Sequence, residues 1–297
     1  MKPSYSIAFL ALSSLFLSPG AACADAGWTS SMGLQAAKGS YAGSQLRDTV
    51  SSYGLVAGAE HPDGSGLTLG LSHADVNATP GTASTRQDAL FASGRMGFKA
   101  EELPGRLGLR LDLHALRNDD ASGDTNGVRV AAPQISYLSA DAARYLDLGY
   151  AHSRYRNDLA VRQWTPSVGF AMNKGSDWLQ LRGWFIAASN PARAQGVSST
   201  SALEAKWTHW LGANVAGIDK LRASVIVGER IYTVDGDAGS VANLSDLQKG
   251  GASFGAEWKV GAHASLLALV GQDRYRNVVL ANDYRLNYAY VWLASQW

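Results

Sequence analysis

The segment Arg106–Leu116, "RLGLRLDLHAL", places a leucine at every second position. Leu107, Leu109, Leu111 and Leu113 alternate with Gly108, Arg110, Asp112 and His114. A period of two scatters side chains around a helix but puts them on one face of a strand. The segment therefore predicts a strand with one apolar and one polar face. The apolar face suits either a second sheet in a soluble protein or lipid around a membrane barrel.

The N-terminus has the pattern of a secretory signal peptide. Lys2 precedes the apolar run "IAFLALSSLFL" (7–17), which is shorter than the ~20 residues of a membrane helix. Small residues follow in "SPGAACADA" (18–26), where a signal peptidase would cut. We predict a signal peptide over residues 1–24, with Ala26/Gly27 as a nearby alternative cleavage point. The mature domain then covers residues 25–297.

Cys23 is the only cysteine and supplies an alternative interpretation, a lipidated N-terminus. Gly20 stands three residues before it, where a lipoprotein signal usually has leucine. If cleavage falls after Ala24, the mature chain has no thiol, which excludes disulfides and thiol catalysis.

Composition favours a membrane protein over a soluble one. Charged residues make up 17% of the chain, against roughly 25% in soluble domains, and there are 32 Gly, 9 Trp and 12 Tyr. Loss of Lys2 with the signal leaves equal numbers of basic and acidic residues, so no nucleic-acid partner is expected. No later apolar run is long enough for a membrane helix. Such a chain can enter a bilayer as a closed barrel, with outer-membrane lipid around it.

Alternating patterns recur along the whole chain and predict an all-β fold, a transmembrane antiparallel up-and-down β-barrel of 14 strands, within a range of 12–16. Each segment reaches the roughly 9–11 residues that a tilted strand needs to cross the membrane. The expected strands are 28–37, 47–59, 66–76, 88–99, 106–117, 127–138, 143–156, 161–172, 178–189, 201–211, 220–233, 250–260, 264–276 and 283–297.

Connections that follow odd-numbered strands differ in length from those that follow even-numbered strands. Links after odd strands are polar and mostly long, such as "VDGDAGSVANLSDLQK" (234–249). Links after even strands are mostly short, such as "SADA" (139–142), with "GANVAGID" (212–219) as an exception. Long outer loops and tight periplasmic turns are typical of outer-membrane barrels. We therefore place the protein in the cell outer membrane.

A short motif recurs where three odd strands approach their outer ends: "LRND" (116–119), "YRND" (155–158) and "YRN" (275–277). We interpret it as an interface girdle, in which the tyrosine ring meets lipid headgroups and the following residues enter water.

The C-terminal strand ends on Trp297, which resembles the signal read by the barrel-assembly machinery. Both faces of this strand are apolar, so its lipid-facing side stays open. Pro133 and Pro166 fall inside expected strands and are interpreted as bulges or strand ends, because proline removes a ladder donor.

Charged residues at alternate positions are expected to face the lumen and line a solute path. They include eight basic and three acidic side chains besides one histidine. Two interpretations are open: an anion-leaning pore that guides anionic sugars, polysaccharide or small acids, or charges that pair across strands and solvate the interior. The predicted lumen residues are Arg95, Lys99, Arg110, Asp112, His114, Arg182, Glu204, Lys206, Arg222, Arg230, Glu257 and Lys259.

Catalytic and metal signals are weak. His263 and Ser265 have the two-residue spacing of outer-membrane lipases, but they fall at an expected periplasmic turn. Asp119, Asp120 and His152 match the outer-rim residues of omptin proteases only loosely. Aspartate-rich "DDASGD" (119–124) and "DGDAG" (235–239) are typical turn sequences rather than calcium loops. We predict no enzyme, no metal and no cofactor.

From "HSRYRND" (152–158), the glycine-rich strands and the terminal tryptophan, the mature chain resembles a Gram-negative outer-membrane β-barrel. Within that class it is similar to YaiO-type barrels and to barrels that export exopolysaccharides. Those exporters usually carry periplasmic tetratricopeptide repeats, which this chain lacks. The resemblance implies a channel or porin function.

Three functions follow as hypotheses. The first is a channel for diffusion or export of a polar solute, anionic or saccharide. The alternative is a surface structural, adhesion or receptor barrel that binds through outer loops 234–249 and 190–200. The third is a lipid-modifying or proteolytic enzyme that uses His114, His152 or His263.

Overall fold

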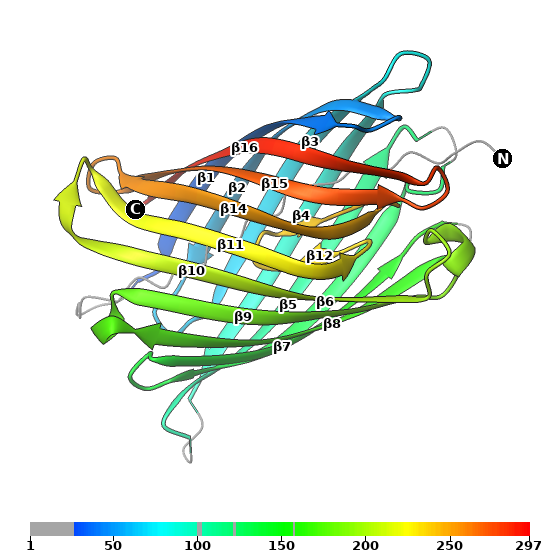
Figure 1. Ribbon diagram of the computed structural model, residues 1–297. Helices are drawn as coiled ribbons and strands as arrows, with labels where there is room; N and C mark the ends of the chain where they lie inside the picture. Colours follow the sequence, from blue (N-terminus) through cyan, green and yellow to red (C-terminus); the bar gives the residue numbers. More distant parts are fainter. Residues whose placement is uncertain (1–26, 100–102, 121–122, 157) are drawn as a thin grey trace.

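A computed structural model describes residues 27–99, 103–120, 123–156 and 158–297 as one closed antiparallel barrel (Figure 1). The predicted signal peptide and Cys23 lie outside the described residues. Fourteen strands form the barrel, as predicted, and each pairs with its neighbours in chain order. Their bounds are β1 Thr29–Ala42, β2 Arg47–Glu60, β3 Gly66–Ala78, β4 Thr85–Phe98, β5 Gly105–Asn118, β6 Val128–Ser139, β7 Arg144–Arg154, β8 Ala160–Met172, β9 Asp177–Ala188, β10 Ser199–Val215, β11 Ile218–Arg230, β14 Leu247–Lys259, β15 Ala264–Asn277 and β16 Asn282–Gln296.

Four short elements lie between these strands. The 3₁₀ turns η1 (Asn173–Gly175) and η2 (Pro191–Arg193) connect wall strands, and β12 (Val234–Asp235) pairs with β13 (Ser240–Val241) as a separate small hairpin. No described helix is long and apolar enough to cross a bilayer.

The first and last strands close the barrel. β1 pairs with β16 from Ser31 opposite Gln296 to Ala42 opposite Arg285. The terminal residue completes this seam, because Trp297 and Ser30 exchange two backbone hydrogen bonds of 2.9 and 3.0 Å. Closure leaves no open sheet edge, which is what lipid demands of a sheet that spans it.

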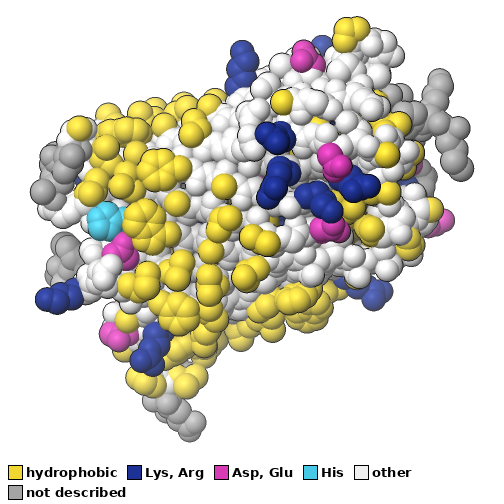
Figure 2. Space-filling view, in the orientation of Figure 1, with side chains coloured by type: hydrophobic (Ala, Val, Ile, Leu, Met, Phe, Trp, Pro, Cys, Tyr) yellow, Lys and Arg dark blue, Asp and Glu magenta, His cyan; other side chains and the backbone are white. Residues whose placement is uncertain are grey.

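The two faces of the wall are those expected from the alternation. On β5, Leu111 and Leu113 are nearly half exposed, whereas Asp112 and His114 are buried inside. The exposed apolar side chains gather into a band on the outside of the barrel (Figure 2). The leucine face therefore meets lipid.

The burial of its side chains shows which face of the last strand, β16, points outwards. Val291 and Leu293 are exposed on the outside, and Tyr290 is buried on the lumen side with Tyr288 and Trp292. Aromatic residues thus line the lumen along β16 rather than anchoring this strand in lipid.

The observed connections confirm that the longest ones follow odd-numbered strands, whereas those that follow even-numbered strands are short. The longest connections, including 119–127, 189–198 and 231–246, lie at the end away from both termini of the barrel. The apparent exception "GANVAGID" disappears, because β10 continues to Val215 and only residues 216–217 form the turn.

The interpretation of the two prolines was wrong. Pro133 lies inside β6 and Pro166 inside β8, and the pairing register is the same on both sides of each. Pairing lapses locally on one side, where proline has no N–H to donate, but no residue is inserted. The bulges lie elsewhere, for example next to Gly250 in β14.

The girdle interpretation of the recurring motif was also wrong. Tyr155 and Tyr275 are buried inside the barrel. The arginine at the second position of the motif points outwards instead, as Arg117 and Arg276 do. An outward aromatic pair does exist, formed by Tyr150 and Trp164 on β7 and β8 with ring centroids 4.8 Å apart.

Leu111→Lys should destabilise the barrel by about 2–4 kcal/mol, because it puts a charge in the middle of the apolar band. Ala115→Lys, on the same outward face nearer the outer end of β5, should cost at most about 1 kcal/mol. Urea unfolding of both variants in lipid vesicles measures the difference. Equal costs at the two depths would contradict the lipid-facing assignment.

Candidate functional site

The connection between β11 and β14 folds into the barrel instead of standing on its rim. We call residues 231–246 the inner segment. Its β12–β13 hairpin lies within the lumen (Figure 1), and Val234, Asp235 and Asn243 are almost fully buried. The expectation that 234–249 forms a surface loop is therefore wrong, and residues 247–249 already belong to β14.

The tip of the inner segment is held by basic side chains of the wall. Arg182 on β9 pairs with both Asp235, at 3.4 Å, and Asp237. Lys206 on β10 adds a contact of 3.3 Å to Asp237. From the opposite side Arg110 on β5 donates to the carbonyl of Gly236. Strands far apart in sequence thus converge on one turn.

Gly236 and Gly239 allow this close approach. A Cβ on Gly236 would lie 2.9 Å from the Asp112 carboxylate, and one on Gly239 would press on the Phe91 ring. Gly239 also has a φ of 59°, a conformation that favours glycine.

A second anchor holds the segment where it rejoins the wall. The Asp246 carboxylate accepts from Arg47 at 2.5 Å, from the Tyr284 hydroxyl at 2.6 Å and from Asn277 at 2.8 Å. Arg47 and Asp246 are both buried. A buried carboxylate with three donors is well satisfied, so this end of the segment is firmly placed.

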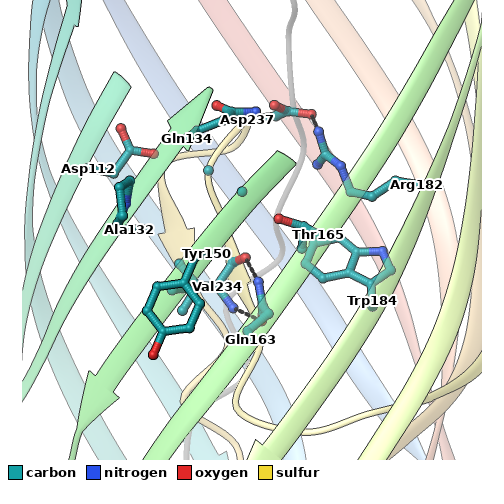
Figure 3. A pocket seen from close by; sticks show the side chains of 14 residues that line it. Asp112, Ala132, Gln134, Tyr150, Gln163, Thr165, Arg182, Trp184, Val234 and Asp237 are labelled. Carbon is teal, nitrogen blue, oxygen red and sulfur yellow. Dashed lines mark hydrogen bonds and ion pairs between the residues drawn. The ribbon is translucent and has the colours of Figure 1, made fainter. Parts of the chain in front are cut away.

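The segment also makes hydrogen bonds through the Val234 backbone and the Asn243 side chain. The Gln163 amide on β8 donates to the Val234 carbonyl at 2.6 Å and accepts from the Val234 N–H at 3.0 Å (Figure 3). Asn243 donates to Gln87 at 2.8 Å and to the Thr125 carbonyl at 2.9 Å. Glutamine therefore replaces the strand partner that the hairpin edge lacks.

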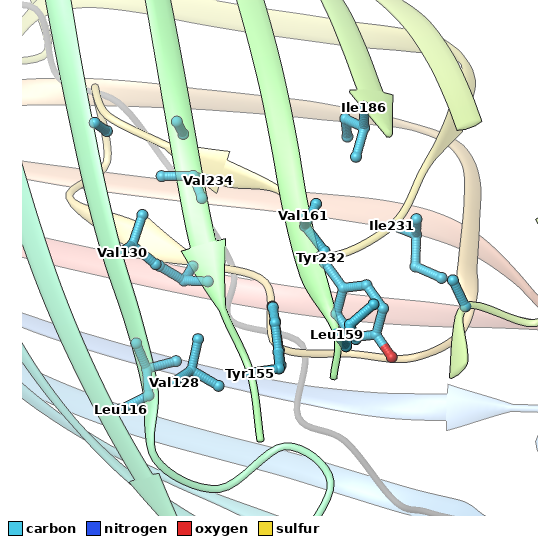
Figure 4. Packing of buried hydrophobic residues seen from close by; sticks show 14 of the residues in the cluster. Leu116, Val128, Val130, Tyr155, Leu159, Val161, Ile186, Ile231, Tyr232 and Val234 are labelled. Carbon is cyan, nitrogen blue, oxygen red and sulfur yellow. The ribbon is translucent and has the colours of Figure 1, made fainter. Parts of the chain in front are cut away.

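Apolar packing also holds the inner segment in the lumen. Ile231, Tyr232 and Val234 of the inner segment pack against Val130 and Val161 of the wall (Figure 4). The outer half of the lumen is thus a small hydrophobic core, and its burial favours the folded-in position of the segment.

A small cavity of about 30 Å³ remains beside the hairpin. Asp112, Arg182 and Asp237 contribute its charged lining, with Gln163 and Trp184 next to them (Figure 3). Gly149 on β7, between the two proline-containing strands, also lines the cavity, and a Cβ there would lie 2.5 Å from the Thr165 hydroxyl.

The predicted lumen residues that belong to strands, which excludes Lys99, occupy inward positions, but their charges are largely paired. Arg110 contacts Asp112 at 2.7 Å, and Arg222 contacts Glu257 at 2.6 Å. The remaining contacts are Arg95 to Glu60, Lys206 to Glu204 at 3.6 Å, Lys259 to Asp219 at 2.8 Å, Arg230 to Gln248 at 2.7 Å, and His114 packed on the Phe91 ring at 4.9 Å.

Arg95, Lys99 and Lys259 belong to the inner mouth rather than the middle of the lumen. The side chains of Arg95 and Lys259 are exposed there, and Lys99 follows the last residue of β4. Glu204, Arg182 and Glu257 are buried within the barrel.

The basic excess counted from the sequence does not describe the lumen. The acids Asp235, Asp237 and Asp246 enter it with the inner segment, and Asp147 and Asp273 occupy inward strand positions. The strand acids could have been found from the same alternation. The segment acids could not, because a polar turn sequence does not reveal that it folds inwards.

The electrostatics of the tip favour ionised Asp237. Burial alone would raise the pKa of this carboxyl, but Arg182, Lys206 and Arg110 outweigh burial and hold the pKa well below its usual value of 3.8. The Asp237 carboxylate therefore stays ionised, and paired with Arg182 and Lys206, across the physiological pH range.

The inner half of the lumen has a different lining. Trp292 and Tyr290 on β16 face Gln35 on β1, and the Tyr290 hydroxyl donates to the Gln35 amide oxygen at 3.1 Å. Among the described residues, the indole N–H groups of Trp178 and Trp292 and the Gln180 amide nitrogen find no acceptor. These donors belong to buried atoms, and the Trp178 and Gln180 side chains are themselves buried.

The histidines considered for catalysis lie in three separate places. His114 faces the lumen, His152 is on the outside of β7, and His263 is in a turn before β15. His263 and Ser265 lie at the end where the chain ends, as expected. Within the described ranges no group of three or more His, Cys, Asp or Glu is arranged to hold a metal ion.

Comparison with known proteins places the fold but gives no family. No family model matches the chain, and no curated protein matches it. Among solved structures, the Pseudomonas putida toluene transporter TodX is 12% identical, with a TM-score of 0.55, covering 92% of this chain and 90% of that one. A bacterial polysaccharide outer membrane secretin is 8% identical, with a TM-score of 0.54, covering 90% and 98%. The fold is that of an outer-membrane β-barrel.

Asp237→Asn should loosen the tip of the inner segment, because it leaves the buried Arg182 and Lys206 short of negative charge. The local opening free energy should fall by about 3 kcal/mol. Hydrogen exchange of residues 231–246 measures it, with the exposed Asp48→Asn as a control. Unchanged protection would contradict the role of the pair.

Acid should release the segment only at very low pH. The pKa of Asp237 is lowered on folding, so its stabilisation is complete above the usual value of 3.8 and disappears as pH falls below it. We expect equal protection of residues 231–246 at pH 7 and pH 5, after correction for intrinsic exchange rates. Loss of protection at pH 5 would contradict the depressed pKa.

Proposed function

We propose that the protein is an outer-membrane channel whose outer half is closed by the inner segment and whose solute is polar and saccharide-like. The observation that carries this is the segment itself: it lies inside a 14-strand lumen and is bound to the wall at two anchors. A lumen of this strand number has room for more than its own side chains, so a segment inside it sets the width of the path.

The anchors differ in a way that supports movement of the tip. Asp246 adjoins β14 and is held by Arg47, Tyr284 and Asn277, whereas the hairpin tip is held mainly by Arg182, Lys206 and Arg110. Displacing the tip would leave the Asp246 anchor in place. We infer that the path opens when the hairpin leaves the wall at β9 and β10.

The lining favours an uncharged or weakly charged solute over an anion. Rings of basic residues select anions when they are unpaired, but the arginines of this lumen mostly contact acids or amides. Trp292, which is half-buried and packs beside Tyr290 in the inner half of the lumen, offers a stacking face to a sugar. The likeness to a polysaccharide outer-membrane secretin is in keeping with this class.

The surface-receptor alternative is less well supported, because the longer of its two proposed binding loops does not lie on the surface. Residues 234–246 are inside the barrel, so only 190–200, which includes η2, remains at the outer rim from the two loops considered. That loop also supports the inner segment, since the Arg193 carbonyl accepts from the Tyr232 hydroxyl at 2.7 Å.

Replacing residues 234–241 with two glycines should raise the unitary conductance several-fold, because it removes the hairpin and keeps the Asp246 anchor. Planar bilayers with the refolded mature chain measure this. Deleting 80–83, in the connection between β3 and β4 outside the lumen, is the control. A barrel that does not conduct even without the hairpin would rule out a channel.

Liposome swelling separates the solute classes. Neutral oligosaccharides should enter vesicles that contain the hairpin-deleted barrel with Arg182→Gln and Lys206→Gln, which removes the two charges that lose Asp235 and Asp237, and Trp292→Ala should slow them. Preferential entry of gluconate would favour an anion channel. Preferential entry of toluene, measured by its partition into the vesicles, would favour an apolar solute instead.

A further inference from the structure

Four arginines stand side by side on the outside of the barrel. Arg117, Arg129, Arg154 and Arg162 belong to the consecutive strands β5, β6, β7 and β8, and all four are exposed. Their neighbours along the chain, including Leu116, Ser153 and Val161, are buried inside. Alternation therefore points the arginines away from the lumen, so the channel hypothesis does not account for them.

This row, which we call the arginine row, lies just beyond the apolar band at the outer end of the wall. One pair further towards the middle, Tyr150 packs on Trp164, and Trp164 is 49% exposed. Outward aromatic residues mark the level of the lipid headgroups in a membrane barrel. The arginine row is therefore level with the headgroups of the outer leaflet.

The row brings like charges together. Arg129 is directly opposite Arg154 in the β6–β7 register. Side chains at such positions are about 5 Å apart at Cβ, and like charges there repel. Asp88 is directly opposite Arg117 in the β4–β5 register, but within the described part of the chain none of the four arginines has a carboxylate within ion-pair distance.

Some of the other basic residues on the outside of the wall are compensated, although Arg274 on β15 and Arg285 on β16 are exposed, lie directly opposite each other and have no carboxylate at ion-pair distance among the described residues. Arg86 contacts Asp75 at 3.4 Å, and Lys249 contacts Glu229 at 2.5 Å. On β14–β16, where Figure 2 shows dark-blue and magenta side chains together beyond the apolar band, Arg276 has Asp283 at 4.0 Å. The arginine row differs in extent, because it places four exposed arginines on four consecutive strands next to an outward aromatic pair.

We propose that the arginine row binds the phosphate groups of a phosphorylated glycolipid in the outer leaflet, of the lipid A type. The guanidinium fork matches phosphate oxygens in two parallel hydrogen bonds. Strands about 4.8 Å apart, with a two-residue offset of about 6.6 Å at each end of the row, spread the four arginines over roughly 20 Å, enough for a headgroup with more than one phosphate. Tyr150 and Trp164 below the row then contact the start of the acyl chains.

The refolded mature barrel in detergent, titrated with bisphosphorylated lipid A and followed by native mass spectrometry, tests this. Arg129→Gln with Arg154→Gln should weaken lipid A binding about tenfold or more, since the closest pair of forks is lost. Arg106→Gln with Arg144→Gln, exposed arginines at the other end of the same wall, should leave it unchanged. Replacement of Arg129 and Arg154 by lysine should restore part of the binding.

Two further arms decide what is recognised. Lipid A without phosphates should bind no better to the wild type than to the Arg129/Arg154 glutamine variant. Inorganic phosphate at millimolar concentration should not displace lipid A, because the acyl contacts are missing. Equal binding of both double variants, phosphate-independent binding, or displacement by free phosphate would each overturn the proposal. Heat-modifiable gel mobility confirms that every variant is folded.

Discussion

Every backbone N–H and C=O group that crosses a bilayer has to find its partner within the protein, and this constraint organises the whole chain. It explains why fourteen strands pair in sequence order and why the sheet returns to its first strand. The last residue participates in closure, since Trp297 bonds to Ser30 across the seam. It also explains why prolines at 133 and 166 are tolerated without bulges: each interrupts pairing on one side only and the register continues.

Closure creates a second requirement, because a barrel of this size has an interior to fill. The chain fills the outer half with its own inner segment, whose acids meet wall arginines and whose apolar residues meet wall valines. The charges that alternate along the strands are thereby neutralised locally. The paired charges of the lumen and the aromatic residues of its inner half are the basis on which we propose a polar, uncharged solute.

The same alternation produces two unlike surfaces from one set of strands. Arg110 and Arg182 point inwards and hold the inner segment, whereas Arg129 and Arg154 point outwards at headgroup level. Their chemical type is identical, and only the parity of position and the depth along the strand distinguish their surroundings. Assigning a role to an arginine in such a barrel therefore begins with these two coordinates.

Local patterning sufficed for the strands: all fourteen, their even number, the lipid-facing leucines and the side of the long connections follow from a period of two and from turn composition. Tertiary structure alone decided which loop lies inside, which face of β16 meets lipid, and which charges are paired. The inner segment reads as an ordinary polar turn, and its burial depends on Arg182, Lys206 and Arg47 from strands distant in sequence. A periodic pattern reports the environment on either side of a strand, but contacts across the lumen join residues that share no local pattern.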